Sequence, residues 1–318
     1  MPVTLGRAQG HVERWSRELA PYPSRSSWPA YLFHICQLEV AVEIIRSGRL
    51  VCRNKVPELI CDVANQGALW NNPNAHKYVR LYFRPQNSFH LKTEGVKAIG
   101  DPFRADRHMS IPIAFAFDFV QVITLPTSGF VPGNFARTGA APLSTDRDFD
   151  GLSFENIYHN SAPSPERMAE IHNWRMSEVV VWDHLDLSSL SRVICRTTQE
   201  ERTLRHLLAG VRQLPKIAVE QKGAVFMRRG MFIDEIYWEN DLLYLKFHGP
   251  VGFTRDKYSL VVHCSEPGIT RTKRYCVAPG RYRLADLAAR SDAVWRVELE
   301  DCVVYEAEAP SVSGLVAR

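Results

Sequence analysis

The stretch Arg175-Met176-Ser177-Glu178-Val179-Val180-Val181 places a basic residue and then a carboxylate at the start of a β-branched run. Residues 179–182 have the composition of a buried strand. Upstream, Ser164-Pro165-Glu166 is typical of a helix start, because Ser accepts backbone N–H bonds, Pro fits the first turn and Glu suits the positive end of the helix dipole. Glu178 is therefore expected where the chain enters a sheet, with its carboxylate directed into a cleft.

A simpler interpretation of the same stretch is a surface ion pair between Glu178 and Arg175. Isolated acid–base pairs at protein surfaces are mostly solvated and contribute little to stability. The two interpretations differ in whether the carboxylate of Glu178 is buried.

Composition indicates a folded protein without a membrane segment. The 318 residues are 45% hydrophobic and carry a formal net charge of +4, a weak preference for polyanions. The first ten residues lack a secretion signal, and no run approaches the roughly 20 apolar residues that cross a bilayer, so a cytoplasmic location is expected. Seven scattered cysteines without a Cys-x-x-Cys pair predict reduced thiols and no metal site.

The pattern along the chain predicts three parts. Residues 1–30 combine arginines with Pro and Ser, which suits a basic arm of a short helix and an extended segment. Residues 31–214 form an α+β domain. Residues 215–318 contain short β-like runs separated by turn residues, the pattern of a small all-β, sandwich-like domain.

Within the first domain, residues 31–35 read as a strand and Leu38 opens a helix that ends at Gly48, which puts His34 at the junction. Residues 78–83 and 111–117 read as further strands, the second one half-buried because its apolar residues alternate. Residues 191–196 read as the last strand of the domain.

The remaining segments of this domain read mostly as loops. Residues 54–77 are expected to form a mobile flap and residues 89–109 a second loop. Residues 127–164 read as a long loop, and its embedded aromatic residues favour a functional role over disorder. Thr198-Gln199-Glu200-Glu201 reads as a capping box that opens a helix.

Several of these residues together suit cleavage of a glycosidic bond to a cationic leaving group. His34 can hold a ribose hydroxyl, and Tyr82-Phe83 can stack on a nicotinamide ring, with Arg84 beside them. Glu178 can stabilise the oxocarbenium-like charge that develops as nicotinamide departs.

At these residues the sequence resembles the DarT family of bacterial toxins, ADP-ribosyltransferases that use NAD to modify bases in single-stranded DNA. The resemblance covers roughly residues 31–208. It rests on five pieces in order, namely Phe33-His34-Ile35-Cys36 followed by a helix and Gly48, Tyr78-Val79-Arg80-Leu81-Tyr82-Phe83-Arg84-Pro85, Ile111-Pro112-Ile113 through Phe117-Asp118, Gly133-Asn134-Phe135-Ala136, and Arg175-Met176-Ser177-Glu178.

The resemblance implies a set of site residues, with two departures from the family pattern. It implies Glu178 and Arg84 as catalytic residues, and it implies a contact with NAD for the residues His34, Ile35, Cys36, Tyr82 and Gln86. The family's arginine after Tyr-Phe-x-Pro is Gln86 here, so either Arg84 takes over its charge or the site is less active. Cys36 replaces the threonine of the family's His-Ile-Thr, where backbone contacts to the nucleotide would be kept.

The resemblance also implies the fold and the reaction. We expect an ADP-ribosyltransferase-like split mixed sheet with an NAD cleft between its halves, followed by the all-β domain. The expected reaction transfers ADP-ribose from NAD to a base of single-stranded DNA, without a metal, and the expected partner is an ADP-ribose-removing antitoxin of macrodomain or similar type. Two alternatives stay open, a transferase acting on RNA or protein and a catalytically silent nucleic-acid-binding module.

Overall fold

The computed structural model describes residues 2–56, 72–98, 101, 108–139, 141–220, 223–240, 242–249, 257–284, 293–308 and 310. They divide into two compact units, each assembled from separate segments. The first unit comprises Met1–Leu91, Ile113–Ile194 and Gln213–Met227, and the second comprises Lys92–Pro112, Cys195–Arg212 and Arg228–Arg318. The predicted α+β class is confirmed. Most of the predicted flap over 54–77 lies outside the described residues.

A seven-stranded sheet with the order β5-β6-β3-β1-β4-β8-β9 organises the first unit. Its strands are β1 (Tyr31–Gln37), β3 (Tyr78–Tyr82), β4 (Pro112–Asp118), β5 (Ser128–Val131), β6 (Glu178–Trp182), β8 (Leu190–Cys195) and β9 (Ile217–Val219). A separate small sheet pairs β2 (Arg49–Val51) with β7 (His184–Asp186).

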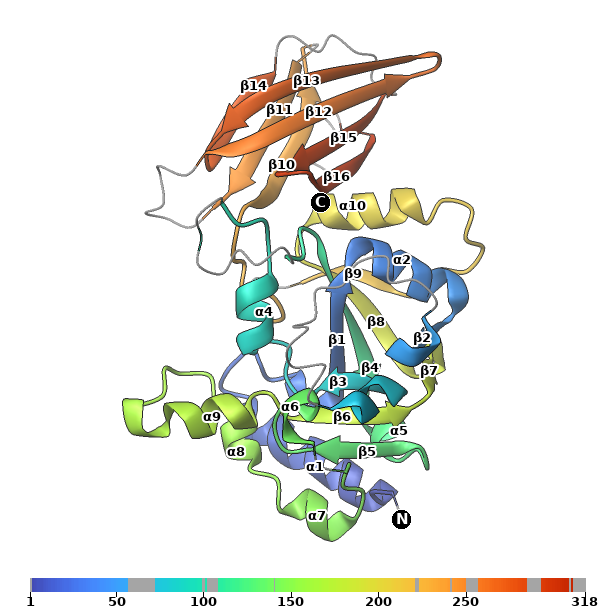
Figure 1. Cartoon of the computed structure of the whole chain (residues 1–318), viewed down its shortest axis with the longest axis vertical. Helices are drawn as coiled ribbons and strands as arrows, with labels where there is room; N and C mark the ends of the chain where they lie inside the picture. Colours follow the sequence, from blue (N-terminus) through green and yellow to red (C-terminus); the bar gives the residue numbers. More distant parts are fainter. Residues whose placement is uncertain are drawn as a thin grey trace. The chain divides into compact units, whose positions relative to one another are not determined.

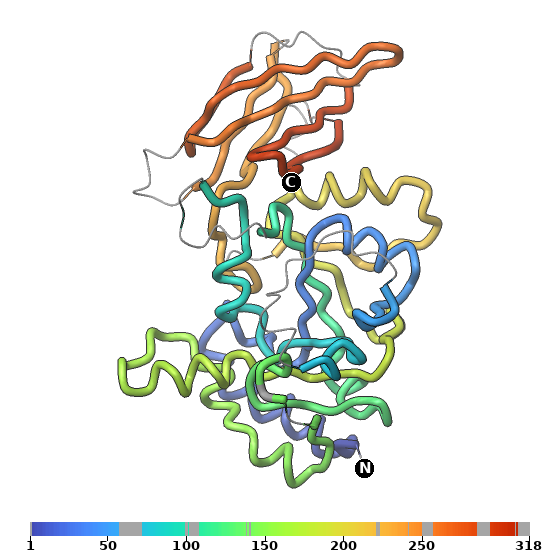
Figure 2. The backbone as a smooth tube through the Cα atoms, viewed as in Figure 1, coloured from blue at the N-terminus to red at the C-terminus, as the bar shows by residue number. Residues whose placement is uncertain are grey.

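The large sheet is split into two groups of strands that run across each other, as Figures 1 and 2 show. Strands β5, β6 and β3 form one antiparallel group, and β1 meets β3 where Phe33 lies opposite Tyr82. Tyr82 also lies opposite Glu178 of β6. Tyr82 therefore occupies the position where β1, β3 and β6 come together, which confirms the predicted split sheet.

The helices of the first unit are mostly short. They are α1 (Leu5–Leu19), α2 (Leu38–Ser47), α4 (Ser88–Thr93), α5 (Phe119–Ile123), α6 (Phe135–Thr138), α7 (Asp146–Asp150), α8 (Phe154–Ile157) and α9 (Met168–Trp174). Helix α2 confirms the predicted one, since its apolar face is buried and Gly48 ends it with φ +73°, a conformation that favours glycine. A 3₁₀ turn, Pro165–Arg167, precedes α9, so the helix start predicted at Ser164 is confirmed.

Helix α1 packs on the rest of the first unit through His11. The ring of His11 stacks on Phe119 at 4.7 Å, and its Nε2 lies 3.0 Å from the hydroxyl of Tyr158. Burial lowers the pKa of His11 to about 3, so this histidine is neutral.

Two predicted strands differ in detail from those observed. Strand β1 continues to Gln37, so His34 lies inside the strand rather than at its junction with α2. Strand β4, between β1 and β8 in the sheet, is buried on both faces from Pro112 to Phe117, so the prediction of a half-buried strand was wrong.

Two predicted loops contain regular structure. Residues 127–164 include β5 and the helices α6, α7 and α8. Residues 88–93 form α4, whose start is capped by Asn87 Oδ1, which accepts the N–H groups of Phe89 and His90. Strand β8 is also not the last of its sheet, because β9 follows it.

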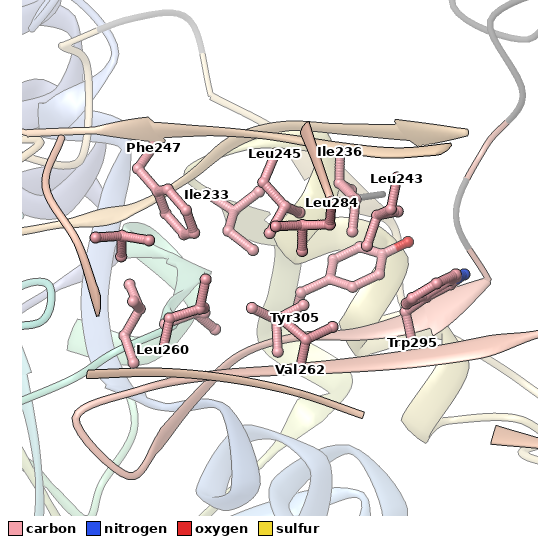
Figure 3. Packing of buried hydrophobic residues seen from close by; sticks show 14 of the residues in the cluster. Ile233, Ile236, Leu243, Leu245, Phe247, Leu260, Val262, Leu284, Trp295 and Tyr305 are labelled. Atoms are coloured by element: carbon pink, nitrogen blue, oxygen red, sulfur yellow. The ribbon is translucent and has the colours of Figure 1, made fainter. Parts of the chain in front are cut away.

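The second unit contains a β-sandwich, as predicted. One sheet has the order β10-β11-β14 and the other the order β13-β12-β15-β16. The strands are β10 (Phe232–Glu239), β11 (Leu242–His248), β12 (Tyr258–Glu266), β13 (Ile269–Val277), β14 (Gly280–Leu284), β15 (Val294–Leu299) and β16 (Cys302–Glu308). Figure 3 shows side chains such as Leu245 and Phe247 of one sheet facing Leu260 and Val262 of the other.

Helix α10 (Thr198–Leu207) belongs to the second unit, and its cap is Thr197, one residue before the cap Thr198 of the predicted capping box. The hydroxyl of Thr197 accepts the N–H of Glu200, whose carboxylate accepts the N–H of Arg196. The buried guanidinium of Arg196 bonds to Glu200, lies 3.3 Å from Glu94 Oε1 and donates to the carbonyl of Ser110. This network connects α10 to the segment around residues 94–110.

Candidate active site

Glu178 is the first residue of β6 and is fully buried. Its Oε2 lies 3.9 Å from Nε of Arg80, and neither carboxylate oxygen completes a hydrogen bond among the described residues. Buried polar atoms in proteins nearly always have a partner, so an unpaired buried carboxylate is a strong indication of a site for a ligand.

The surroundings of Glu178 bring the ionisation of its carboxyl group close to physiological pH. Burial raises its pKa to about 7. The charge of Arg80 opposes the shift, and so do the backbone N–H of Phe135 and the hydroxyl of Tyr82, whose hydrogen-bonding contacts with the carboxylate lie outside ordinary hydrogen-bond geometry. Near pH 7 the carboxyl group can therefore stabilise positive charge and exchange a proton.

Arg80 is a site residue that the sequence did not single out. It lies two residues before Tyr82 on β3, and alternate residues of a strand share a face, so Arg80 and Tyr82 both reach Glu178. The Arg80 side chain is 26% exposed, whereas Glu178 is not exposed at all. The guanidinium thus connects the buried carboxylate with the surface.

His34, expected to contact NAD, lies next to this pair. Its Nδ1–H donates to the backbone carbonyl of Arg80 at 3.3 Å, which leaves Nε2 as the hydrogen-bond acceptor. Burial, together with the charge of Arg80, lowers the pKa of His34 to about 4 although its ring is partly exposed. The imidazole is neutral and offers a lone pair.

His90 is a second residue that the sequence did not single out. It lies on α4, and its ring meets the ring of Tyr82 edge to face at 5.4 Å. Its Nδ1–H donates to the carbonyl of Pro85, and its buried Nε2 has no partner among the described residues. Burial lowers the pKa of His90 to about 4. His90 thus supports Tyr82 with a neutral ring.

The backbone on the other side of Glu178 is held in place by the segment 133–135. Gly133 has φ +91°, and a Cβ there would lie 2.4 Å from Asn173 Oδ1, so only glycine fits. Its N–H donates to Ser177 Oγ at 3.1 Å. Asn72 donates to the carbonyl of Phe135 at 3.0 Å, which helps to hold the Phe135 amide near the carboxylate.

Arg84, expected to be catalytic, is buried, and its hydrogen bonds go to residues away from Glu178. Its guanidinium donates to the carbonyls of Ile157 and His159 and to Asn160 Oδ1, and it lies 4.8 Å from the ring of Trp28. Burial, then Arg175 and Arg25, lower its pKa. These contacts hold the turn after α8 and include none with Glu178.

Three other residues expected to contact NAD, namely Gln86, Ile35 and Cys36, have side chains that contact other parts of the protein. The Gln86 amide donates to the carbonyls of Gly223 at 2.9 Å and Phe226 at 3.3 Å. Ile35 and Cys36 follow His34 on β1, and their side chains are buried. A contact of these two residues with a ligand would therefore use backbone atoms.

The alternative of a surface ion pair between Glu178 and Arg175 was wrong. Arg175 donates to His159, through its carbonyl at 2.9 Å and its Nδ1 at 2.8 Å, and to the carbonyl of Ser161 at 2.6 Å. Glu178 is buried, and its cationic neighbour is Arg80.

Two features are absent from the part of the chain that the structure describes. No three His, Cys, Asp or Glu side chains gather there as ligands for a metal ion. No helix there is long and apolar enough to cross a membrane.

A split sheet with a buried carboxylate, an arginine and a tyrosine where its halves meet suits a class of enzymes that stabilise positive charge on a sugar. A family model described as "ssDNA thymidine ADP-ribosyltransferase, DarT" matches residues 33–227. Because this match covers more than half of the sequence, the chain belongs to the DarT family, an ADP-ribosyltransferase family. Comparison with curated proteins finds no match.

Solved structures of low sequence identity resemble this chain, and the first of them shares its fold. Thermus sp. 2.9 DarT in complex with NAD+ is 15% identical with a TM-score of 0.50, and the match covers 62% of this chain and 98% of that one. The same protein with ADP-ribosylated ssDNA is 13% identical with a TM-score of 0.49, covering 62% and 96%. Thermosipho africanus DarTG in complex with ADP-ribose is 11% identical with a TM-score of 0.45, covering 71% and 57%.

Proposed function

We propose that this protein transfers ADP-ribose from NAD to a thymine base of single-stranded DNA and releases nicotinamide. The observation that carries the proposal is the buried, unpaired carboxylate of Glu178 beside Arg80 in a member of this family. The family description names the acceptor, and NAD+ is the ligand of the Thermus relative. The catalytic function is assigned to the first unit, which contains Glu178 and Arg80.

The reaction needs a negative group that acts as one bond breaks and another forms. The bond between the nicotinamide nitrogen and ribose C1′ breaks, and nicotinamide leaves with the electron pair. Positive charge then develops on the ribose, where the Glu178 carboxylate stabilises it. Because this charge exists only in the transition state, the carboxylate lowers the barrier without tightening substrate binding.

The acceptor base must lose a proton when it bonds to C1′. In DNA, N3 is the ring nitrogen of thymine that carries a hydrogen. A carboxyl group with a pKa of about 7 can take this proton and return it to solvent. Glu178 therefore supplies both charge stabilisation and a base.

The neighbouring residues orient NAD and the carboxylate. His34, a neutral acceptor at Nε2, would hold a ribose hydroxyl, and Tyr82 would contact the nicotinamide ring. Arg80 is assigned the charge beside Glu178, and Arg84 acts as a positioning residue for the turn 157–160. Gln86 would position the end of β3, the strand that carries Arg80 and Tyr82.

The product also suggests a partner and a location. A modified base persists in DNA until an enzyme removes it, so we include an ADP-ribose-removing antitoxin, of macrodomain or similar type, in the proposal. A DNA-modifying enzyme works where DNA is, which supports a cytoplasmic location.

The test is incubation of the full chain with labelled NAD and four acceptors, namely a thymidine-containing DNA strand, a strand without thymidine, an RNA of the same length, and protein. We expect label on the first acceptor alone, with one nicotinamide released per transfer. Label on RNA or protein instead would contradict the proposed acceptor. Binding of DNA without any nicotinamide release would contradict catalysis.

A further inference from the structure

In the β-sandwich, positive charges lie mainly along one edge and negative charges along the opposite edge. Residues 269–284, which include β13 and β14, contain five Lys and Arg and no Asp or Glu. The whole chain has a formal net charge of only +4. This segment thus carries more positive charge than the chain as a whole.

Both strands of this segment are edge strands. Strand β14 ends one sheet of the sandwich and β13 ends the other. Because only Ala278 and Pro279 connect the two strands, both edges lie on the same side of the sandwich, as Figure 1 shows. We call this side the basic edge, defined by Arg271, Lys273, Arg274, Arg281 and Arg283.

The opposite edge has the opposite charge. Strands β10 and β16 lie side by side there and contain no Lys or Arg. Their carboxylates are Asp234, Glu235, Glu239, Glu306 and Glu308. Helix α10 packs against this acidic edge, on β16 and β10. The sandwich is therefore polarised, with its basic edge on the side away from α10.

Most cations of the basic edge are available to a partner. Lys273, Arg274, Arg281 and Arg283 are exposed, and within the described residues none of them forms an ion pair. Arg271 pairs with a carboxylate of β12, Glu266, at 3.4 Å.

Protection of edge strands does not account for this pattern. Charged side chains, Lys above all, prevent a strand edge from pairing with another chain, but the basic edge has one Lys and four Arg. The acidic edge already uses carboxylates. An edge made of cations alone is instead complementary to a polyanion.

Aromatic side chains lie next to these cations. Tyr244 of β11 lies opposite Arg283 of β14 and stacks on Tyr237, with ring centroids 4.9 Å apart and an interplanar angle of 6°. The guanidinium of Arg281 lies 5.5 Å from the Tyr244 ring centroid. Aromatic rings beside a line of cations are typical of surfaces that bind single strands, whose bases are free to stack.

We infer that the basic edge binds phosphates of the single-stranded DNA substrate, outside the region that the family model covers. This inference rests on the proposed function, which supplies the polyanion. Strand β13 has nine residues and extends for about 30 Å, a length that can contact several consecutive phosphates. The edge would add affinity that is independent of base sequence.

The test uses the full chain with Lys273, Arg274 and Arg283 all changed to Gln. Arg281 is kept because it contacts Tyr237. Affinity for a fluorescent oligothymidylate is measured by anisotropy over a salt series. Each lost phosphate contact lowers the slope of log K against log salt by roughly 0.7, so we expect the slope to fall by about 2 and affinity at 0.1 M salt to fall roughly a hundredfold.

A matched control removes three cations that are already neutralised. Arg46, Arg205 and Arg296 pair with Glu43, Glu201 and Glu298, and their change to Gln should leave the salt slope unchanged. If the test variant does not fold, Lys273→Gln alone should lower the slope by roughly 0.7.

The outcomes separate the inference from the proposed function. A test variant with the wild-type slope overturns the inference, as does lost affinity for duplex DNA without loss for the single strand. A wild-type protein that modifies no DNA contradicts the proposed function itself, whatever the variants bind. Support requires weaker DNA binding together with unchanged nicotinamide release from NAD alone.

Discussion

The charge of Glu178 is the residue-scale feature on which the proposed reaction depends. Glu178→Gln keeps the size and much of the hydrogen bonding of the side chain but removes its negative charge. Transfer should fall by roughly two to three orders of magnitude, as when one electrostatic stabiliser is lost. Affinity for NAD should stay nearly constant, because the positive ribose is absent from the ground state. Single-turnover rates and calorimetry with NAD measure the two quantities.

The pH profile provides the control for this substitution. The wild-type rate should rise with pH through about 7 and then level off, because the ionised carboxylate is the reactive form. Glu178→Gln should lack this rise. Arg175→Ala should keep the transfer activity, since Arg175 bonds to His159 and Ser161. A Glu178→Gln protein with near wild-type transfer would contradict the mechanism.

Sequence reasoning reached part of the residue cluster around Glu178. The position of Glu178 at the start of a β-branched run and that of His34 between an expected strand and helix indicate these two residues, together with the family resemblance. Arg80 had an available signal, its spacing of two from Tyr82 on a strand. His90 had none, because its contact with Tyr82 depends on how the chain turns after Pro85.

At the scale of elements, we predict that Arg196 holds α10 to the segment around residues 94–110. Arg196→Met should destabilise the second unit by about 3–5 kcal/mol, because it leaves Glu94 and Glu200 buried without their cation. Chemical denaturation measures the loss. Adding Glu94→Gln and Glu200→Gln should recover much of it. A cost below about 1 kcal/mol would show that the network is solvated.

The elements predicted correctly are those with a long periodic pattern. Helix α2 and strand β6 have clear apolar spacing, whereas α4 and α7 are too short for a period and are defined by capping, at Asn87 and Thr145. Strand β14 has only five residues, and its alternating Arg281 and Arg283 are the exposed residues that make it part of the basic edge.

At the scale of the molecule, buried histidines predict acid sensitivity of the first unit. His11, His34 and His90 have folded pKa values of about 3, 4 and 4, below the unfolded value near 6.5. The unfolded chain therefore takes up protons first, and the stability from these residues is lost as pH falls from 6.5 towards 4. Glu178 acts in the opposite direction, but one group does not offset three.

Calorimetry from pH 7 to pH 4.5 should show this loss as a lower melting temperature. His11→Phe keeps an aromatic ring among Phe119 and Phe154 and cannot titrate, so its melting temperature should change less with pH than that of the wild type. An identical pH dependence of the two proteins would exclude His11 as a source of acid sensitivity.

The sequence does not reveal which distant segments of the chain assemble into each unit. The second unit takes residues 92–112 and 195–212 from between segments of the first. The contact between Glu94 and Arg196 joins positions about a hundred residues apart, and no local pattern encodes it. Strand composition predicts a sandwich, but not which distant segments pack on it.

The burial of Glu178 also has a consequence for natural selection. Its pKa in the folded protein exceeds the unfolded value near 4.5, so the ionised form costs the fold about 3 kcal/mol above pH 7. A neutral side chain there relieves this cost and lowers the proposed transfer activity by orders of magnitude. Where the proposed transfer to DNA harms the cell that makes the enzyme, selection therefore favours a mutant at position 178, which accumulates as a more stable and far less active protein.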